Sequence, residues 1–166
     1  MHLLGNSLFL WVFGNNIEDS MGRLRFVIFY LLCGLAAAAA QVAVNPSAPV
    51  PMVGASGAIS GVMGAYLVLF PRVRVNMLFI VFVFIRIFPL PAWLVLVWWF
   101  VLQLLSALPG LTGMERASGG VAFMAHAGGF VAGLLLVKLF ENPSLVARRV
   151  HAPRRVHTSR FYRSGF

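Results

Sequence analysis

The stretch GASGAISGVMG, residues 54–64, decides the fold because it is a run of small residues with one serine near its start, Ser56. Gly57 and Gly61 are four residues apart and Gly64 follows one turn later, so a helix here presents a face with almost no side chains. Three prolines within residues 46–51 exclude a helix just upstream. The helix is therefore expected to begin close to Ser56, where its first backbone amides have no helical partner.

The composition excludes an ordinary soluble domain. Of the 166 residues, 60% are hydrophobic and 10% are charged, and the mean hydropathy is +0.89. These values predict an all-α, polytopic membrane helical bundle. The single cysteine, Cys33, excludes an internal disulfide and a cysteine-cluster metal site.

Five apolar segments approach the length of about 20 residues that spans a bilayer as a helix. They cover residues 1–17, 24–43, 54–70, 92–108 and 121–140. Residues 14–22, between the first two, are predicted to be a turn-rich loop. Residues 75–88 are apolar but short and rich in β-branched and aromatic side chains, which weakens a helix prediction. We expect them to form an interfacial or re-entrant segment.

The basic residues predict the orientation. Nearly all of them fall on one side of the five spans, which places the carboxyl terminus in the cytoplasm by the positive-inside rule. These are Arg23, Arg25, Arg72, Arg74, Arg86, Lys138, Arg148, Arg149, Arg154, Arg155, Arg160 and Arg163, whereas Arg116 lies on the other side. Residues 1–141 are predicted to be the membrane domain and residues 142–166 a disordered, basic cytoplasmic tail.

The start of the chain opens directly into an apolar helix with no basic flank and no signal-peptide pattern. Nothing in this segment explains how the amino terminus would reach the outer side. We therefore expect an upstream span to be missing and the chain to be a fragment; the alternative is a shortened but genuine protein.

Polar side chains gather at one level, toward the outer side of the predicted bundle. In the last span, AHAGGFVAG, His126 shares a face with Gly129 and Gly133. In the first span, His2 and Asn6 are four residues apart on one face. With Ser56, these groups come from three helices and differ in depth by less than about 10 Å. Ionisable and polar groups in membrane helices are costly, so this agreement predicts a functional site.

The residue types at this level predict acyl-transfer chemistry. A serine nucleophile needs a base within hydrogen-bond reach, and His126 can serve as base and then as acid. The four acids, Glu18, Asp19, Glu115 and Glu141, lie in loops or at span ends. A Ser56–His126 dyad is therefore expected, with Asn6, His2 and the Ser56 backbone amide stabilising the oxyanion and no metal or cofactor. Gln41 is assigned no role.

The ordered motifs resemble those of the rhomboid intramembrane serine proteases. They are HxxxN at His2 to Asn6, GxSG at Gly54 to Gly57, and AHxxGxxxG at residues 125–133. The resemblance implies a rhomboid-like bundle in which Gly54, Gly57, Gly61, Gly129 and Gly133 pack around the site. It also implies single-span membrane proteins as substrates and catalysis without cofactor. By this resemblance, the first family helix and its following loop are expected to be missing from the chain, and a bacterial or archaeal plasma membrane is the expected location.

Two other functions compete with this prediction. An inactive rhomboid-like fragment or pseudoprotease would bind membrane proteins without cleaving them, but such relatives generally lack the serine or the histidine, and this chain has both. A small channel or transporter would carry polar residues through the whole membrane depth. Nucleic acid is not an expected partner; the lipid bilayer and transmembrane substrates are. The oligomeric state is not determined by the sequence.

Overall fold

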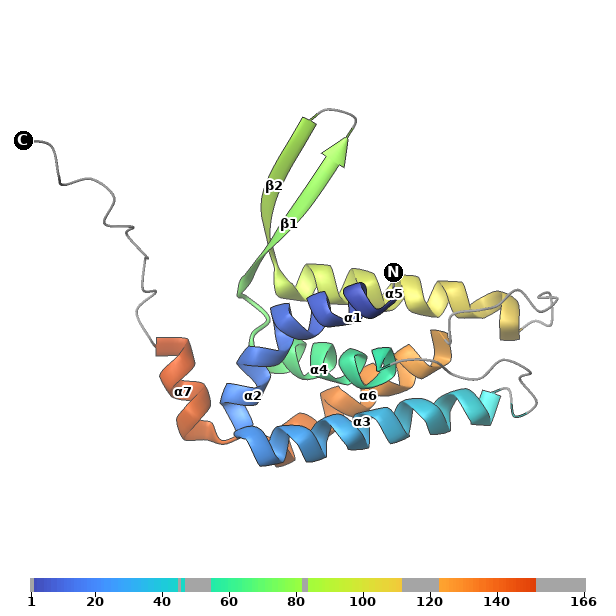
Figure 1. Ribbon diagram of the computed structural model, residues 1–166, viewed down its shortest axis with the longest axis horizontal. Helices are drawn as coiled ribbons and strands as arrows, with labels where there is room; N and C mark the ends of the chain where they lie inside the picture. The colour runs from blue at the N-terminus through green and yellow to red at the C-terminus, as the bar shows by residue number, and fades with distance from the viewer. Residues whose placement is uncertain (1, 45, 47–54, 82–83, 112–122, 152–166) are drawn as a thin grey trace, which may run out of the picture.

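The computed structural model describes residues 2–44, 46, 55–81, 84–111 and 123–151. The chain is mostly helical over these residues and contains one two-stranded antiparallel sheet (Figure 1). The elements, in order, are α1 (His2–Phe9), η1 (Leu10–Gly14), α2 (Asn15–Met21), α3 (Arg23–Val44), α4 (Ser56–Leu69), β1 (Arg74–Val81), β2 (Phe84–Pro91), α5 (Ala92–Leu111), α6 (Phe123–Phe140) and α7 (Pro143–His151). The predicted all-α class is right for the bundle and wrong for residues 74–91.

The first three segments, α1, the π-helical η1 and α2, run without a break from residue 2 to residue 21. The prediction of a turn-rich loop at residues 14–22 is wrong, because Phe13, Ile17 and Met21 are buried at four-residue spacing and hold this stretch as a helix. The break comes at Gly22 alone. Its φ of 86° lies in the left-handed region that favours glycine, and it turns the chain from α2 into α3.

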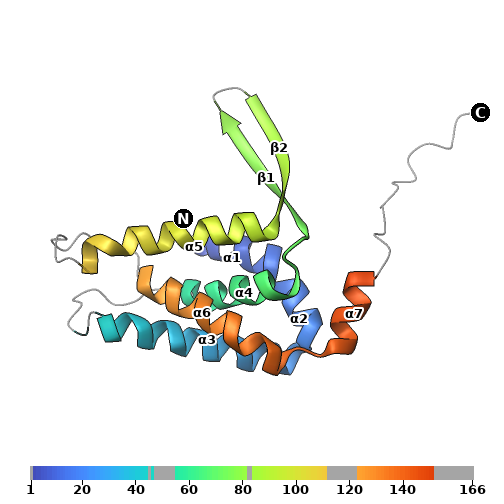
Figure 2. The same cartoon turned by 180° about the vertical axis from the view of Figure 1, so that it is seen from behind.

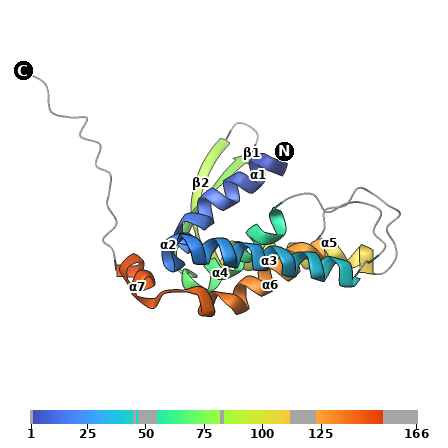
Figure 3. The same cartoon turned by 60° about the horizontal axis from the view of Figure 1, so that its bottom comes forward.

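Helix α4 is the centre of the bundle. Eleven of its 14 residues are buried, with α3 and α6 on one side and α5 and the α1 region on the other (Figures 1 and 2). Helices α3 and α6 also pack directly on each other (Figure 3). The largest fully buried side chains come from α2, α3, α4, α5 and α6, and include Ile17, Phe29, Val62, Met63, Leu96, Phe130 and Val137.

Two helices of the described residues are long and apolar enough to cross a membrane, α3 and α6. Helix α4 is apolar but has 14 residues, fewer than a full span needs. In α5 the described side chains, Ala92–Ser106, are apolar as well. The prediction of five full-length spans is therefore only partly supported.

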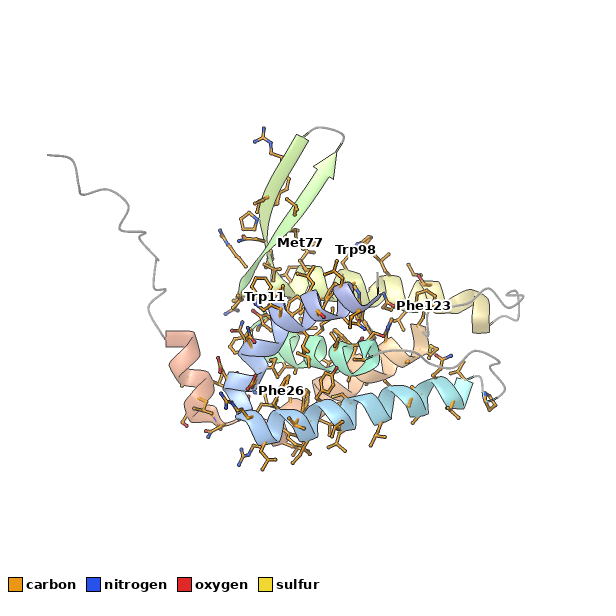
Figure 4. The ribbon with its side chains drawn as sticks, viewed as in Figure 1. Trp11, Phe26, Met77, Trp98 and Phe123 are labelled. Carbon is orange, nitrogen blue, oxygen red and sulfur yellow. The ribbon has the colours of Figure 1, made fainter. Side chains whose placement is uncertain are left out.

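Residues 74–91 form a β-hairpin between α4 and α5. Strands β1 and β2 pair in antiparallel register from Arg74 opposite Pro91 to Val81 opposite Phe84. The hairpin projects steeply away from the helix axes (Figures 1 and 2), and Met77 lies near its base, beside α5 (Figure 4). The β-branched and aromatic composition that argued against a helix here is typical of strands.

The last described segment, α7, is helical where the sequence predicted disorder. Pro143 occupies its first turn, where a missing amide is harmless. The Asn142 Oδ1 accepts hydrogen bonds from the backbone amide of Ser144 at 3.2 Å and from its hydroxyl at 2.8 Å. The backbone amide of Asn142 donates a hydrogen bond to the backbone carbonyl of Ser20 at 2.8 Å, which ties the start of α7 to α2. The remainder of the predicted tail, residues 152–166, lies outside the described residues.

Candidate active site

The site lies at one end of the bundle, where α4 and α6 begin and where α3 and α5 end (Figure 1). Ser56 is the first residue of α4, and the amide of Ile59 already bonds to the Ala55 carbonyl at 3.0 Å. His126 is in the first turn of α6. Phe123, the residue that opens α6, is at the same end of the molecule (Figure 4). The predicted helix start at Ser56 is confirmed.

Ser56 and His126 are in direct contact. The Oγ of Ser56 and the Nε2 of His126 are 2.8 Å apart, within hydrogen-bond distance, although 70 residues separate them in sequence. Both side chains are partly buried. The pair therefore has the geometry that a serine nucleophile and a general base would need before reaction.

Glycine contacts between α4 and α6 set this distance. A methyl group at Gly129 would overlap the carbonyl oxygen of Gly57, and a methyl at Gly133 would overlap that of Gly61. The two helices thus touch backbone to backbone over two turns next to the Ser56–His126 pair. This is the close approach that the glycine spacing predicted. Gly54 lies outside the described residues.

The second ring nitrogen of His126 is bound by a residue that the sequence reasoning missed. The Nδ1 is 2.8 Å from the Oε1 of Gln103, in α5. A carbonyl oxygen can only accept, so Nδ1 carries the proton and Nε2 presents its lone pair to the Ser56 hydroxyl. Trp99, one turn before Gln103, lies 5.9 Å from the His126 ring between centroids. The available signal was a side-chain amide within an otherwise apolar span, whose other polar residue is Ser106.

Gln41 has a role that the sequence did not suggest. Its Oε1 accepts a hydrogen bond of 3.3 Å from the backbone amide of Ala125, 84 residues away. The first amides of a helix lack partners within it, so a side chain from the end of α3 supplies one. Gln41 thereby ties α3 to the turn that carries His126.

The structure shows no hydrogen bond from the other two predicted site residues, His2 and Asn6, to Ser56 or His126 among the described side chains. Helix α1, which contains His2 and Asn6, contacts α4. Asn6 is partly buried, and among the described residues it forms no hydrogen bond to Ser56 or His126. The side chain of His2 lies outside what the structure describes. Their role at the oxyanion stays a prediction.

No group of three or more histidine, cysteine, aspartate or glutamate side chains that could hold a metal ion occurs among the described residues. Glu18 and Asp19 are in α2 and Glu141 follows α6, all at the opposite end of the bundle. Glu18 pairs there with Arg23, with 3.6 Å between its Oε1 and the Arg23 Nε. The polar groups described next to Ser56 and His126 are therefore uncharged amides.

The fold and this site define a mostly helical protein with membrane-length helices and a serine–histidine pair at one end of them. A model of the Rhomboid domain matches residues 1–142. The chain belongs to the rhomboid family, whose members are integral membrane proteins.

Two curated relatives show the same relationship. Over 66 residues the chain is 41% identical to rhomboid protease GluP of Bacillus subtilis (strain 168), covering 40% of this chain and 12% of that protein. Over 140 residues it is 31% identical to the mitochondrial Rhomboid protein 1 of Saccharomyces cerevisiae, covering 81% of this chain and 36% of that one. The aligned part thus spans about a third of the length of the Saccharomyces cerevisiae protein. No solved structure matches the chain significantly.

Proposed function

We propose that this chain is an intramembrane serine endopeptidase that cleaves single-span membrane proteins near the outer face of the membrane. The observation that carries the proposal is the 2.8 Å hydrogen bond between Ser56 Oγ and His126 Nε2. Membership of the rhomboid family supports it, as does similarity to a protein named as a rhomboid protease.

The proposed reaction uses Ser56 and His126 alone as covalent and proton-transfer groups. The Ser56 Oγ attacks the carbonyl carbon of the scissile peptide bond while its proton passes to His126 Nε2. His126 then gives that proton to the amide nitrogen as the C–N bond breaks, which leaves an acyl-serine. A water molecule then attacks the acyl carbon while its proton passes to His126 Nε2. His126 returns that proton to the Ser56 Oγ as the ester C–O bond breaks, which releases the new carboxyl terminus and regenerates Ser56 and neutral His126.

Negative charge develops on the substrate oxygen in both steps. Ser56 is at the start of α4, where backbone amides point out of the helix without helical acceptors. We propose that the Ser56 amide, the Asn6 side-chain amide and His2 donate hydrogen bonds to this oxyanion. The contact of α1 with α4 supports the placement of Asn6 near this end.

We infer that the bundle crosses the bilayer five times, with its carboxyl terminus in the cytoplasm of a bacterial or archaeal cell. The inference is supported by the charges of the described residues: Arg23, Arg72, Arg74 and Lys138 all lie at the end of the bundle opposite Ser56. Basic residues favour the cytoplasmic side. The site then faces the outer side, where a transmembrane substrate can enter from the lipid.

The test is covalent labelling in liposomes. The chain is reconstituted, treated with a fluorophosphonate probe and compared with Ser56→Ala and His126→Ala; Ser144→Ala, at the far end of the bundle, is the control for a remote serine. We expect labelling of wild type and Ser144→Ala, a labelled peptide containing Ser56, and background labelling of the two site variants. Equal labelling of wild type and Ser56→Ala would reject the protease function and leave a protein that binds membrane proteins without cleaving them.

A further inference from the structure

His126 is held from two sides by side-chain amides of flanking helices. Gln103 bonds to its ring nitrogen Nδ1 at 2.8 Å, and Gln41 bonds to the backbone amide of the preceding residue, Ala125, at 3.3 Å. The first contact acts on the imidazole itself and the second on the helical turn that carries it. The two glutamines therefore have separable effects.

We propose that Gln103 is the positioning residue of this site and does the work that a carboxylate does in a serine–histidine–aspartate triad. The proposal rests on the protease function above. By accepting the Nδ1 proton, Gln103 holds His126 in the tautomer in which Nε2 can take the Ser56 proton. It also fixes the rotation of the ring, with Trp99 packed beside the ring at 5.9 Å.

An amide suits this position because the site lies between apolar helices. A carboxylate at that depth would carry a charge that is costly to remove from water. The acids of the described residues, Glu18, Asp19 and Glu141, all lie at the other end of the bundle. Gln103 orients the imidazole without a permanent charge.

The experiment compares Gln103→Leu, Gln103→Glu and Gln41→Leu by the rate of fluorophosphonate labelling as a function of pH. Gln103→Leu keeps the size but removes the acceptor, and we expect labelling to slow by about tenfold, the rate equivalent of one hydrogen bond. Gln103→Glu should label, with the acid limb of its pH profile moved to higher pH, because the carboxylate stabilises the protonated imidazole. Gln41→Leu should lower thermal stability and leave the position of the limb unchanged.

Two results would overturn the proposal: a wild-type labelling rate in Gln103→Leu, or an unshifted acid limb in Gln103→Glu. A purely structural role would lower the amount of folded protein in both variants without moving the limb. Failure of the protease function itself is distinct, because the wild-type protein would then label no better than Ser56→Ala.

A second observation, independent of the catalytic site, concerns the hairpin of β1 and β2. It contacts the bundle mainly through α5, and it projects steeply from the helix axes at the end where α2 and α7 lie (Figures 1 and 2). Leu78 and Ile87 are cross-strand partners and are 58% and 64% exposed. Arg74 and Arg86, within the strands, are exposed too, as is Arg72 just before them.

Neither water nor the hydrocarbon core suits this hairpin. An exposed apolar pair is unfavourable in water, whereas a two-stranded sheet has unpaired outer edges that hydrocarbon cannot satisfy. The membrane surface meets both requirements, and residues 70–91 contain three arginines and no acid. We infer that the hairpin lies on the lipid surface and binds anionic headgroups through Arg72, Arg74 and Arg86.

The test places a fluorescent probe on Ile87→Cys; the unmodified chain, whose Cys33 is buried, reports background labelling. In liposomes containing phosphatidylglycerol we expect spin labels at the lipid headgroup to quench the probe more than spin labels deep in the acyl chains or iodide in water. Changing Arg72, Arg74 and Arg86 together to Gln should raise quenching by iodide at least twofold. Dominant quenching by iodide or by deep labels in the parent, or no effect of the triple change, would overturn the inference.

Discussion

Replacing Gly129 by alanine tests whether the close contact between Gly129 and Gly57 sets the distance between Ser56 and His126. The new methyl would overlap the Gly57 carbonyl oxygen, which is backbone and cannot rotate away. Because a side-chain carbon essentially never lies closer than 3.0 Å to such an oxygen, α4 and α6 must separate by about 1 Å. The distance between Ser56 Oγ and His126 Nε2 would then grow from 2.8 Å to about 3.8 Å, outside hydrogen-bond reach.

The expected loss of labelling rate is about 100-fold, the usual effect of a 1 Å misplacement in a catalytic pair. Stability should change less. Overpacking costs about 1–3 kcal/mol, and the better helix propensity of alanine returns about 1 kcal/mol, so we expect a net loss of at most about 2 kcal/mol. Fluorophosphonate labelling and thermal unfolding in the same detergent measure the two effects.

Gly34→Ala is the matched control, because a methyl there meets only the Ala58 Cβ at 3.4 Å, an ordinary contact. It should label at the wild-type rate and be as stable as wild type or more stable. Equal labelling of Gly129→Ala and Gly34→Ala, at a temperature where both are folded, would refute the claim that this glycine contact positions Ser56 against His126.

Three further substitutions have defined expectations. Asn6→Ala should slow cleavage of a single-span substrate by about 100-fold or more if its amide binds the oxyanion, whereas an unchanged rate would remove Asn6 from the site. Gly22→Ala should destabilise the protein by about 1–2 kcal/mol because of the positive φ at this position. The control is Gly5→Ala, where a methyl meets open space and should not destabilise the protein. Equal melting temperatures of the two variants would contradict the role of the positive φ. Asn142→Ala should increase hydrogen exchange in the first turn of α7 through loss of the cap, at a cost of about 1 kcal/mol, and unchanged exchange there would show that the cap contributes nothing.

The sequence predicted the helices best where an apolar stretch was uninterrupted. Helix α3 begins and ends within one residue of the predicted segment 24–43, and α4 begins at Ser56 as expected. The prediction failed at residues 14–22 because asparagines and acids were taken as loop signals, although buried Phe13, Ile17 and Met21 follow a helical period. Here burial of three apolar side chains outweighs the turn preferences of their polar neighbours.

The sequence predicted two residues of the candidate site, Ser56 and His126, and missed two others, Gln103 and Gln41. Ser56 and His126 occur in motifs with glycines whose spacing specifies a helix face, so their approach could be inferred from sequence alone. Gln103 and Gln41 lie in spans that carry no such pattern; Gln103 is 23 residues from His126, and Gln41 is 15 residues from Ser56. Which of their faces points to His126 depends on how α5 and α3 rotate about their axes, and periodicity in a uniformly apolar helix does not determine that rotation.

The placement of charge explains why this site uses amides. The acids of the described chain are at the end of the bundle opposite Ser56, and Arg23, Arg72, Arg74 and Lys138 are there as well. Groups with a permanent charge thus lie at one end of the bundle. Ser56, His126 and Gln103 lie at the other end, between apolar helices, where a permanent charge would be costly. In the proposed reaction the only cation formed there is His126 after it takes the Ser56 proton, and it forms together with the oxyanion. Each charge then has its partner within the same transition state, so a neutral Gln103 is sufficient to orient the base.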